Sequence, residues 1–157
     1  MTVEIERKFV LSELPDRATL GTGERLRQGY IADNGEISVR VRIAAGGAQL
    51  TVKAGSGMTR TEVELPLSPD EAEALWPHTV GGRISKTRHR VTLDQPGSPV
   101  AEVDVYDAGL VGLYTVEVEF STEAAALEFV PPAWFGREVT GQKAWTNAAL
   151  ARDGMPI

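Results

Sequence analysis

Charged residues recur at every second position in run after run of this sequence. The first run is Glu4-Ile5-Glu6-Arg7-Lys8, and the same spacing returns in Arg40-Val41-Arg42, Glu62-Val63-Glu64 and Glu117-Val118-Glu119. Successive side chains of a β-strand point to opposite faces of the sheet. Each run therefore predicts a strand with one charged face and one face that is mostly apolar, and the chain must fold into a sheet that separates the two.

Turn signals between these runs set the order of the strands. Asp33-Asn34-Gly35, Gly46-Gly47 and Pro96-Gly97 are dipeptides and tripeptides typical of tight turns. Because consecutive runs are separated by only a few residues, the spacing indicates a β-meander. We expect strands near residues 4–8, 25–31, 37–43, 49–53, 60–65, 83–91, 100–106 and 113–120.

Helices are expected to be few and short. A helical turn is predicted over 16–20, and Ser68-Pro69-Asp70-Glu71 combines a cap, an initial proline and a capping-box glutamate for a helix that ends at about Trp76. Ser121 is predicted to cap a helix through 124–129, and Thr140 a C-terminal helix to about Ala151. The tryptophans are expected to pack these helices and the C-terminal segment on the outside of the sheet: Trp76, Trp134 and Trp145.

Length and composition indicate one globular domain over residues 1–157, with 42% hydrophobic and 24% charged residues. No apolar run approaches the roughly 20 residues of a membrane span, and no signal peptide is visible, so no membrane partner is expected. The chain has no cysteine, which excludes thiolate metal sites and fits a cytoplasmic location. A net charge of −6 argues against a nucleic-acid partner. The oligomeric state is left open, with a homodimer among the alternatives.

The charged positions continue on one face of the other expected strands and balance in sign. This face has one acid for every base and few of the Ser, Thr or Gln residues of a solvated sheet. An open sheet with one face in water is the simpler alternative. If instead about eight strands close into a barrel, these side chains converge in a narrow lumen, where a polyanion and divalent cations would offset their charge. The members are Glu4, Glu6, Glu62, Glu64, Glu102, Asp104, Glu117 and Glu119 among the acids, and Lys8, Arg40, Arg42, Lys53, Arg60, Lys86, Arg88 and Arg90 among the bases.

Six of these motifs, in this order, resemble the CYTH superfamily of triphosphate tunnel metalloenzymes. They are E-x-E-x-K at 4–8, R-x-R at 40–42, Lys53, E-x-E at 62–64, K-x-R at 86–88 and E-x-E at 117–119. The length and the segment Leu26-Arg27-Gln28-Gly29-Tyr30 resemble the short bacterial members, which are similar to inorganic triphosphatases. The resemblance implies an α+β, mainly β fold: a closed eight-stranded antiparallel β-barrel, or tunnel, with a charged lumen and a few external helices.

The resemblance also implies roles for single residues. Two Mg²⁺ or Mn²⁺ ions are expected on Glu4, Glu6, Glu117 and Glu119, with Asp104 assisting. Catalytic roles are implied for Lys8, Tyr30, Glu117 and Glu119. Tyr30 would lie near Lys8 and help to activate water, and a metal ion near Glu117 and Glu119 would orient that water. Phosphate contacts are implied for Lys8, Arg40, Arg42, Lys53, Lys86 and Arg88, and the further lumen residues are Arg60, Glu62, Glu64, Arg90 and Glu102.

One segment departs from the family pattern. Bacterial members often read E-V-T-x-D-x-R-Y-x-N near the end, whereas this chain has Gln142, Ala144 and Trp145 in place of the Asp, Arg and Tyr. The departure leaves open what the segment does for tunnel closure or substrate choice.

We expect metal-dependent hydrolysis of a small-molecule triphosphate, inorganic tripolyphosphate to pyrophosphate and phosphate. A class IV adenylyl cyclase and a thiamine triphosphatase are alternatives on the same fold. A non-catalytic polyphosphate-binding module is the alternative from another class. The paired carboxylates argue against the last, because binding alone needs bases more than acids.

Overall fold

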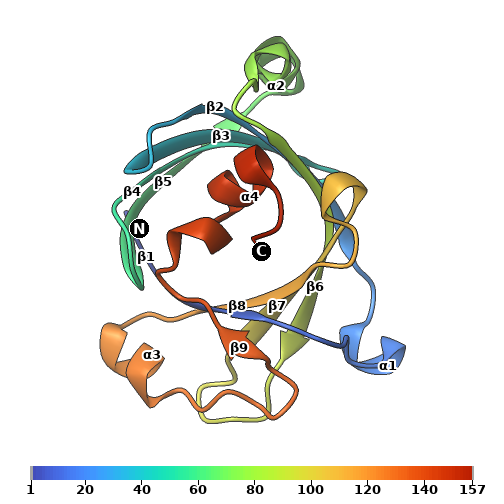
Figure 1. The fold of residues 1–157 in the computed structure, drawn as a ribbon, viewed down its shortest axis with the longest axis vertical. Helices are drawn as coiled ribbons and strands as arrows, with labels where there is room; N and C mark the ends of the chain where they lie inside the picture. The colour runs from blue at the N-terminus through green and yellow to red at the C-terminus, as the bar shows by residue number, and fades with distance from the viewer. Residues whose placement is uncertain (1, 157) are drawn as a thin grey trace.

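The computed structural model describes residues 2–156, and its centre is a closed antiparallel β-barrel (Figure 1). Eight strands form the wall in the order β5-β4-β3-β2-β6-β7-β8-β1, and a pairing between β5 and β1 closes it. The expected eight-stranded barrel is thus confirmed. The strands are β1 (Val3–Val10), β2 (Glu24–Asp33), β3 (Ile37–Ala44), β4 (Gly47–Ala54), β5 (Thr59–Leu67), β6 (Arg83–Thr92), β7 (Val100–Tyr106) and β8 (Tyr114–Glu119).

A ninth strand, β9 (Arg137–Glu138), was not predicted. β1 pairs with β5 only over Val3–Ile5, and β9 takes the same edge of β1 at Phe9 and Val10. Strand β9 therefore supplies backbone partners to the part of the β1 edge that β5 does not reach. Two residues carry too little alternation for a sequence to reveal them.

The register directs charged side chains inward and apolar side chains outward. Directly opposed residues share a face, and the opposed pairs include Lys8 with Glu117, Arg88 with Asp104 and Arg40 with Tyr30. The outward Val103, Val116 and Val118 are completely buried in a core on the outside of the barrel, which also contains Phe9, Phe129 and Phe135. Half-exposed Trp134 packs against that core, as expected.

Three helices lie outside the barrel (Figure 1): α1 (Arg17–Leu20), α2 (Pro69–Leu75) and α3 (Glu123–Glu128). The capping box is confirmed, because the Ser68 hydroxyl accepts from the Glu71 amide while the Glu71 carboxylate accepts from the Ser68 amide. The predicted cap of α3 was wrong by one residue. Thr122, not Ser121, accepts the hydrogen bond from the Ala125 amide. Short 3-10 turns are η1 (Trp76–His78), η2 (Ala108–Leu110) and η3 (Lys143–Trp145).

The C-terminal helix begins later than predicted. α4 (Asn147–Asp153) is capped by Thr146, whose hydroxyl accepts from the Ala149 amide. Thr140 is not available as a cap, because its hydroxyl accepts from the Lys8 amide at 2.9 Å and donates to Glu138 at 2.7 Å. Those bonds hold the chain extended beside β1.

The position predicted for Trp145 was also wrong. Trp145 lies in a second core with Ile84, Tyr106 and Leu150, and it lines the cavity of the barrel rather than the exterior. The reason is that α4 crosses a mouth of the barrel (Figure 1). None of the helices in residues 2–156 is long and apolar enough to cross a membrane.

Candidate active site in the barrel lumen

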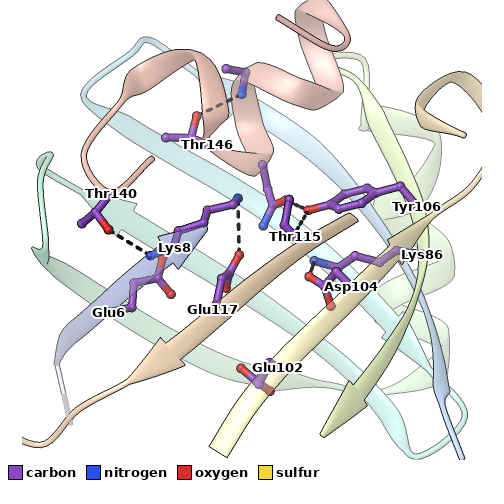
Figure 2. A network of polar contacts seen from close by, with 12 residues as sticks. Glu6, Lys8, Lys86, Glu102, Asp104, Tyr106, Thr115, Glu117, Thr140 and Thr146 are labelled. Atoms are coloured by element: carbon purple, nitrogen blue, oxygen red, sulfur yellow. Dashed lines mark hydrogen bonds and ion pairs between the residues drawn. The ribbon is translucent and has the colours of Figure 1, made fainter. Parts of the chain in front are cut away.

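Strand β1 sets Glu4, Glu6 and Lys8 in a row inside the barrel, and all three are buried. β8 runs antiparallel beside it, so that Glu119 lies opposite Glu6 and Glu117 opposite Lys8. The Lys8 Nζ is 3.3 Å from a carboxylate oxygen of Glu117. Figure 2 marks this contact with a dashed line. Although burial opposes ionisation of Glu117, the charges of Lys8 and Arg88 hold its pKa well below the usual range.

On strands β6 and β7, Asp104 is bound by two bases. One of its oxygens accepts from Lys86 at 2.6 Å, and Arg88 donates to both oxygens at 2.7 and 2.8 Å. Burial raises the pKa of Asp104, but Arg88 and Lys86 outweigh it and lower that pKa to about 2. Burial lowers the pKa of Lys86 to about 7 against the attraction of Asp104. The Asp104 carboxylate is therefore neutralised by neighbouring side chains of β6, without a bound ion.

On strands β4 and β5, Lys53 and Arg60 reach across to the β1 carboxylates. Lys53 Nζ lies 2.9 Å from Glu4 and 3.4 Å from Glu62. Arg60 lies 3.1 Å from Glu4 and 3.3 Å from Glu6. These two bases and the acids beside them link β5 to β1 where the barrel closes.

Three carboxylates form a group that could hold a metal ion: Glu4, Glu62 and Glu119 each offer an oxygen, and these oxygens lie within 4.8 Å of one another. Oxygen-only ligands suit a hard divalent cation. Glu62 was expected in the lumen but not as a ligand, and the pairing of β4 with β5, which sets Glu62 opposite Lys53, brings it there. Glu6, Asp104 and Glu117, which were expected as ligands, lie outside this group of three.

Three acids of the site have raised pKa values in the absence of metal, and burial is the main cause for Glu119. Burial, and then repulsion from Glu117, raise the pKa of Glu6 to about 8. Burial raises the pKa of Glu62 to about 7 despite the attraction of Lys53. A cation bound beside them would favour the charged forms, so metal binding should release protons.

The open space of the lumen is a cavity of about 140 Å³. Its charged wall combines bases with acids and includes the Tyr30 side chain, which was expected near Lys8. The cavity continues to a mouth between the β2–β3 turn, the β4–β5 turn and a segment that we call the C-terminal strap, residues 139–153. The charged lining residues in the lumen are Glu6, Lys8, Arg40, Lys53, Arg60 and Glu117.

Polar contacts fix the C-terminal strap across the mouth. The Val139 amide donates to the Lys8 carbonyl at 2.8 Å, and the Tyr106 hydroxyl donates to Asn147 Oδ1 at 2.7 Å. Arg152 pairs with Asp33, and Lys143 lies 3.6 Å from Glu36. The strap therefore forms one wall of the site, a role that the sequence did not reveal.

Other predicted lumen residues do not line this cavity. Arg90 is exposed and pairs with Glu24 and Glu102, while Glu64 and Glu119 are exposed as well. Arg42 is half-buried and donates to Gln28. The site as a whole offers clustered bases for an anion and clustered acids for a cation.

Comparisons with known proteins find relatives over nearly the whole chain. The family model described as CYTH domain matches residues 2–138. An inorganic triphosphatase of Nitrosomonas europaea is 41% identical over 150 residues, 94% of this chain and 96% of that protein. An inorganic triphosphatase of Acetivibrio thermocellus is 34% identical, over 98% of this chain and 96% of that protein. The crystal structure of the inorganic triphosphatase NE1496 is 38% identical and superimposes with a TM-score of 0.69 over 99% of both chains.

Proposed function

The chain belongs to the CYTH domain family, and we propose that it is an inorganic triphosphatase, which hydrolyses tripolyphosphate to pyrophosphate and phosphate with a divalent metal ion. The observation that carries the proposal is one cavity, open at a mouth, whose lumen wall includes four bases, Lys8, Arg40, Lys53 and Arg60, beside the acidic side chains of Glu6 and Glu117. Phosphoryl transfer needs positioning and charge neutralisation rather than covalent chemistry, and this lumen is suited to both.

The bases would hold the phosphate chain. Arg40 and Lys53 belong to neighbouring strands and face the same cavity. Arginines can grip phosphate oxygens with two parallel hydrogen bonds, whereas a lysine acts as a point charge. Lys8 lies beside Glu117, so we assign Lys8 and Glu117, with Tyr30, to the end of the chain where water attacks.

The carboxylates would hold Mg²⁺ or Mn²⁺, two ions per site. Glu4, Glu62 and Glu119 fit one such ion by their convergence, and Glu6 and Glu117 are proposed for a second. A bound ion would neutralise phosphoryl oxygens and lower the pKa of bound water. For Asp104 we propose a positioning role, because Lys86 and Arg88 already occupy both of its oxygens. We also propose a cytoplasmic location, which the lack of cysteine supports.

Phosphate release from tripolyphosphate, ATP and thiamine triphosphate, each with and without Mg²⁺ or Mn²⁺, tests the proposal. We expect the highest kcat/KM on tripolyphosphate and no turnover when the metal is chelated. Formation of cyclic AMP from ATP, faster hydrolysis of thiamine triphosphate, or binding of tripolyphosphate without any hydrolysis would each replace the proposal by one of the alternatives.

A further inference from the structure

One wall of the lumen contains buried polar groups that have no partner. In residues 2–156, three buried side-chain nitrogen or oxygen atoms lack a hydrogen-bond partner: Gln28 Nε2, Arg40 Nε and Thr51 Oγ1. They belong to the adjacent strands β2, β3 and β4, and the register sets Thr51 opposite Arg40 and Gln28 opposite Arg42. Gln28 and Thr51 are 0% and 1% exposed.

The opposite wall of the lumen, formed by β6, β7 and β8, is equally buried, but its Lys86, Asp104 and Thr115 side chains have hydrogen-bond partners. Lys86, Arg88 and Asp104 bind one another, and the Thr115 hydroxyl donates to the Tyr106 hydroxyl at 3.3 Å. Thr51 and Thr115 both face the lumen, from opposite walls. The Thr115 hydroxyl has a hydrogen-bond partner, whereas the Thr51 hydroxyl has none. Burial alone does not explain the difference, because a buried polar group is normally paired.

The unpaired groups on β2, β3 and β4 are donors. Arg42 donates to Gln28 Oε1 from Nε at 3.2 Å and from Nη2 at 3.1 Å, so the amide oxygen is occupied and the NH2 is free. Arg40 Nε can only donate, and the Thr51 hydroxyl can donate. A ligand that satisfies all three must offer several acceptor oxygens, and a phosphate chain offers only acceptors.

We propose that Thr51 and Gln28 hydrogen-bond the phosphate chain directly, as uncharged members of the substrate site. Thr51 lines the cavity beside Arg40, and Gln28 lies next along the same wall, opposite Arg42. The inference rests on the proposed function, because it takes tripolyphosphate as the ligand. Thr51 belongs to none of the motifs that carry the family resemblance, and Gln28 belongs only to the segment Leu26-Arg27-Gln28-Gly29-Tyr30, where no role was assigned to it. Gln28 has a second task, since its oxygen holds the Arg42 guanidinium in place.

Uncharged donors suit this wall because its bases already repel one another. Burial, and then the charge of Arg40, lower the pKa of Arg42 to about 10. A further lysine or arginine at position 28 or 51 would add to that repulsion whenever the cavity is empty. A hydroxyl or an amide adds a hydrogen bond to the anion without adding charge.

The Thr51→Val variant tests the proposal, with Thr51→Ser as the conservative variant. Valine keeps the shape and removes the hydroxyl. We expect KM for tripolyphosphate to rise about tenfold with kcat little changed, because a hydrogen bond to a charged group is lost in ground and transition state alike. The melting temperature of the ligand-free protein should stay or rise, because the lost hydroxyl had no partner. Thr51→Ser should restore the KM.

Thr115→Val is the matched control, the same substitution on the paired wall. It should lower the ligand-free melting temperature, because it breaks the bond to Tyr106, and it should keep the full upward shift that tripolyphosphate produces. Thr51→Val should show the reverse: a normal ligand-free melting temperature and a reduced shift with tripolyphosphate.

Gln28→Glu is a second, independent variant. Its carboxylate keeps an acceptor for Arg42 but replaces the donor nitrogen by an oxygen that repels phosphate. We expect a folded protein that binds tripolyphosphate at least tenfold more weakly by calorimetry. If the wild type neither hydrolyses nor binds tripolyphosphate, the proposed function fails. If the wild type does both while Thr51→Val and Gln28→Glu keep its affinity within twofold, only the present inference is overturned.

Discussion

Lys8 on β1 and Glu117 on β8 are opposed in register, and their charged groups lie 3.3 Å apart inside the barrel (Figure 2). Both side chains are buried, at 7% and 6% exposure. Two charges removed from water are costly unless each is compensated. Arg88 gives Glu117 a second contact only at 3.8 Å, so Lys8 is the principal partner of this acid. A phosphate that approaches Lys8 must therefore share it with Glu117.

The first prediction separates chemistry from binding. Lys8→Ala should lower kcat on tripolyphosphate about a hundredfold with little change in KM, because Lys8 is assigned to the reacting end of the chain. Lys53→Ala should mainly raise KM, because Lys53 is assigned to ground-state binding. Steady-state kinetics with saturating Mg²⁺ measures both parameters. If Lys8→Ala keeps its kcat and shows only a raised KM, the role assigned to Lys8 is wrong.

The second prediction concerns the metal group. Glu62→Gln should raise the Mg²⁺ or Mn²⁺ concentration needed for half-maximal activity by about tenfold or more, because one of three converging carboxylates is lost. Glu64→Gln is the matched control, since Glu64 lies two residues along β5, is exposed and is outside the group. Titration of both variants with each metal decides the point. Equal metal dependence in the two variants would remove Glu62 from the ligand set.

The sequence predicted which face of each strand is charged, because alternation is a local property of Glu4, Glu6 and Lys8 or of Arg40 and Arg42. It did not predict which charges meet. Asp104 could have been a metal ligand or a partner of bases, and only the pairing of β6 with β7 brings Lys86 and Arg88 onto it.

The same limit applies to the residues that were missed. Gln28 and Thr51 are ordinary polar residues in the sequence. Gln28 Nε2 and Thr51 Oγ1 lack partners because the neighbouring strands β2, β3 and β4 place no hydrogen-bond acceptor beside them. The C-terminal strap was predicted as a helix on the outside that is capped by Thr140. The observed cap is Thr146, which has the same side chain and therefore the same capping chemistry. The bond from the Lys8 amide to Thr140 decides between them, and no local pattern encodes it.

The third prediction is a fall in the stability of the metal-free protein as the pH rises from 5 to 7. The folded-state pKa values of Glu6 and Glu62 are raised to about 8 and about 7, above the usual 4.5. At pH values between 4.5 and these raised pKa values, the two carboxyls are largely protonated in the folded state and ionised in the unfolded state. The folded state therefore binds more protons, and rising pH favours unfolding. The lowered pKa values of Asp104 and Glu117 make stability rise with pH, but only below pH 4.5. The lowered pKa of Lys86 also makes stability rise with pH, but only above about pH 7.

Thermal melts in chelator between pH 5 and 7 measure this effect. Mg²⁺ or Mn²⁺ should flatten the pH dependence, because a bound cation keeps the carboxylates charged. Glu6→Gln should weaken the dependence even without metal. A melting temperature of the metal-free wild type that rises with pH across this window would contradict the prediction.

The last prediction assigns substrate choice to the C-terminal strap. Trp145 is buried in the strap and lines the cavity, so Trp145→Ala removes an indole from one wall of the site. The substitution should cost about 3 kcal/mol of stability, as is usual for large aromatic residues in cores. It should also raise the ratio of kcat/KM on ATP to that on tripolyphosphate by roughly tenfold, because the enlarged chamber accepts a substituent on the phosphate chain. Trp134→Ala is the matched control, since Trp134 packs on Phe135 outside the barrel and does not line the cavity. It should destabilise the protein and leave the ratio unchanged. If both variants lose stability but neither changes the ratio, the strap closes the barrel without selecting the substrate.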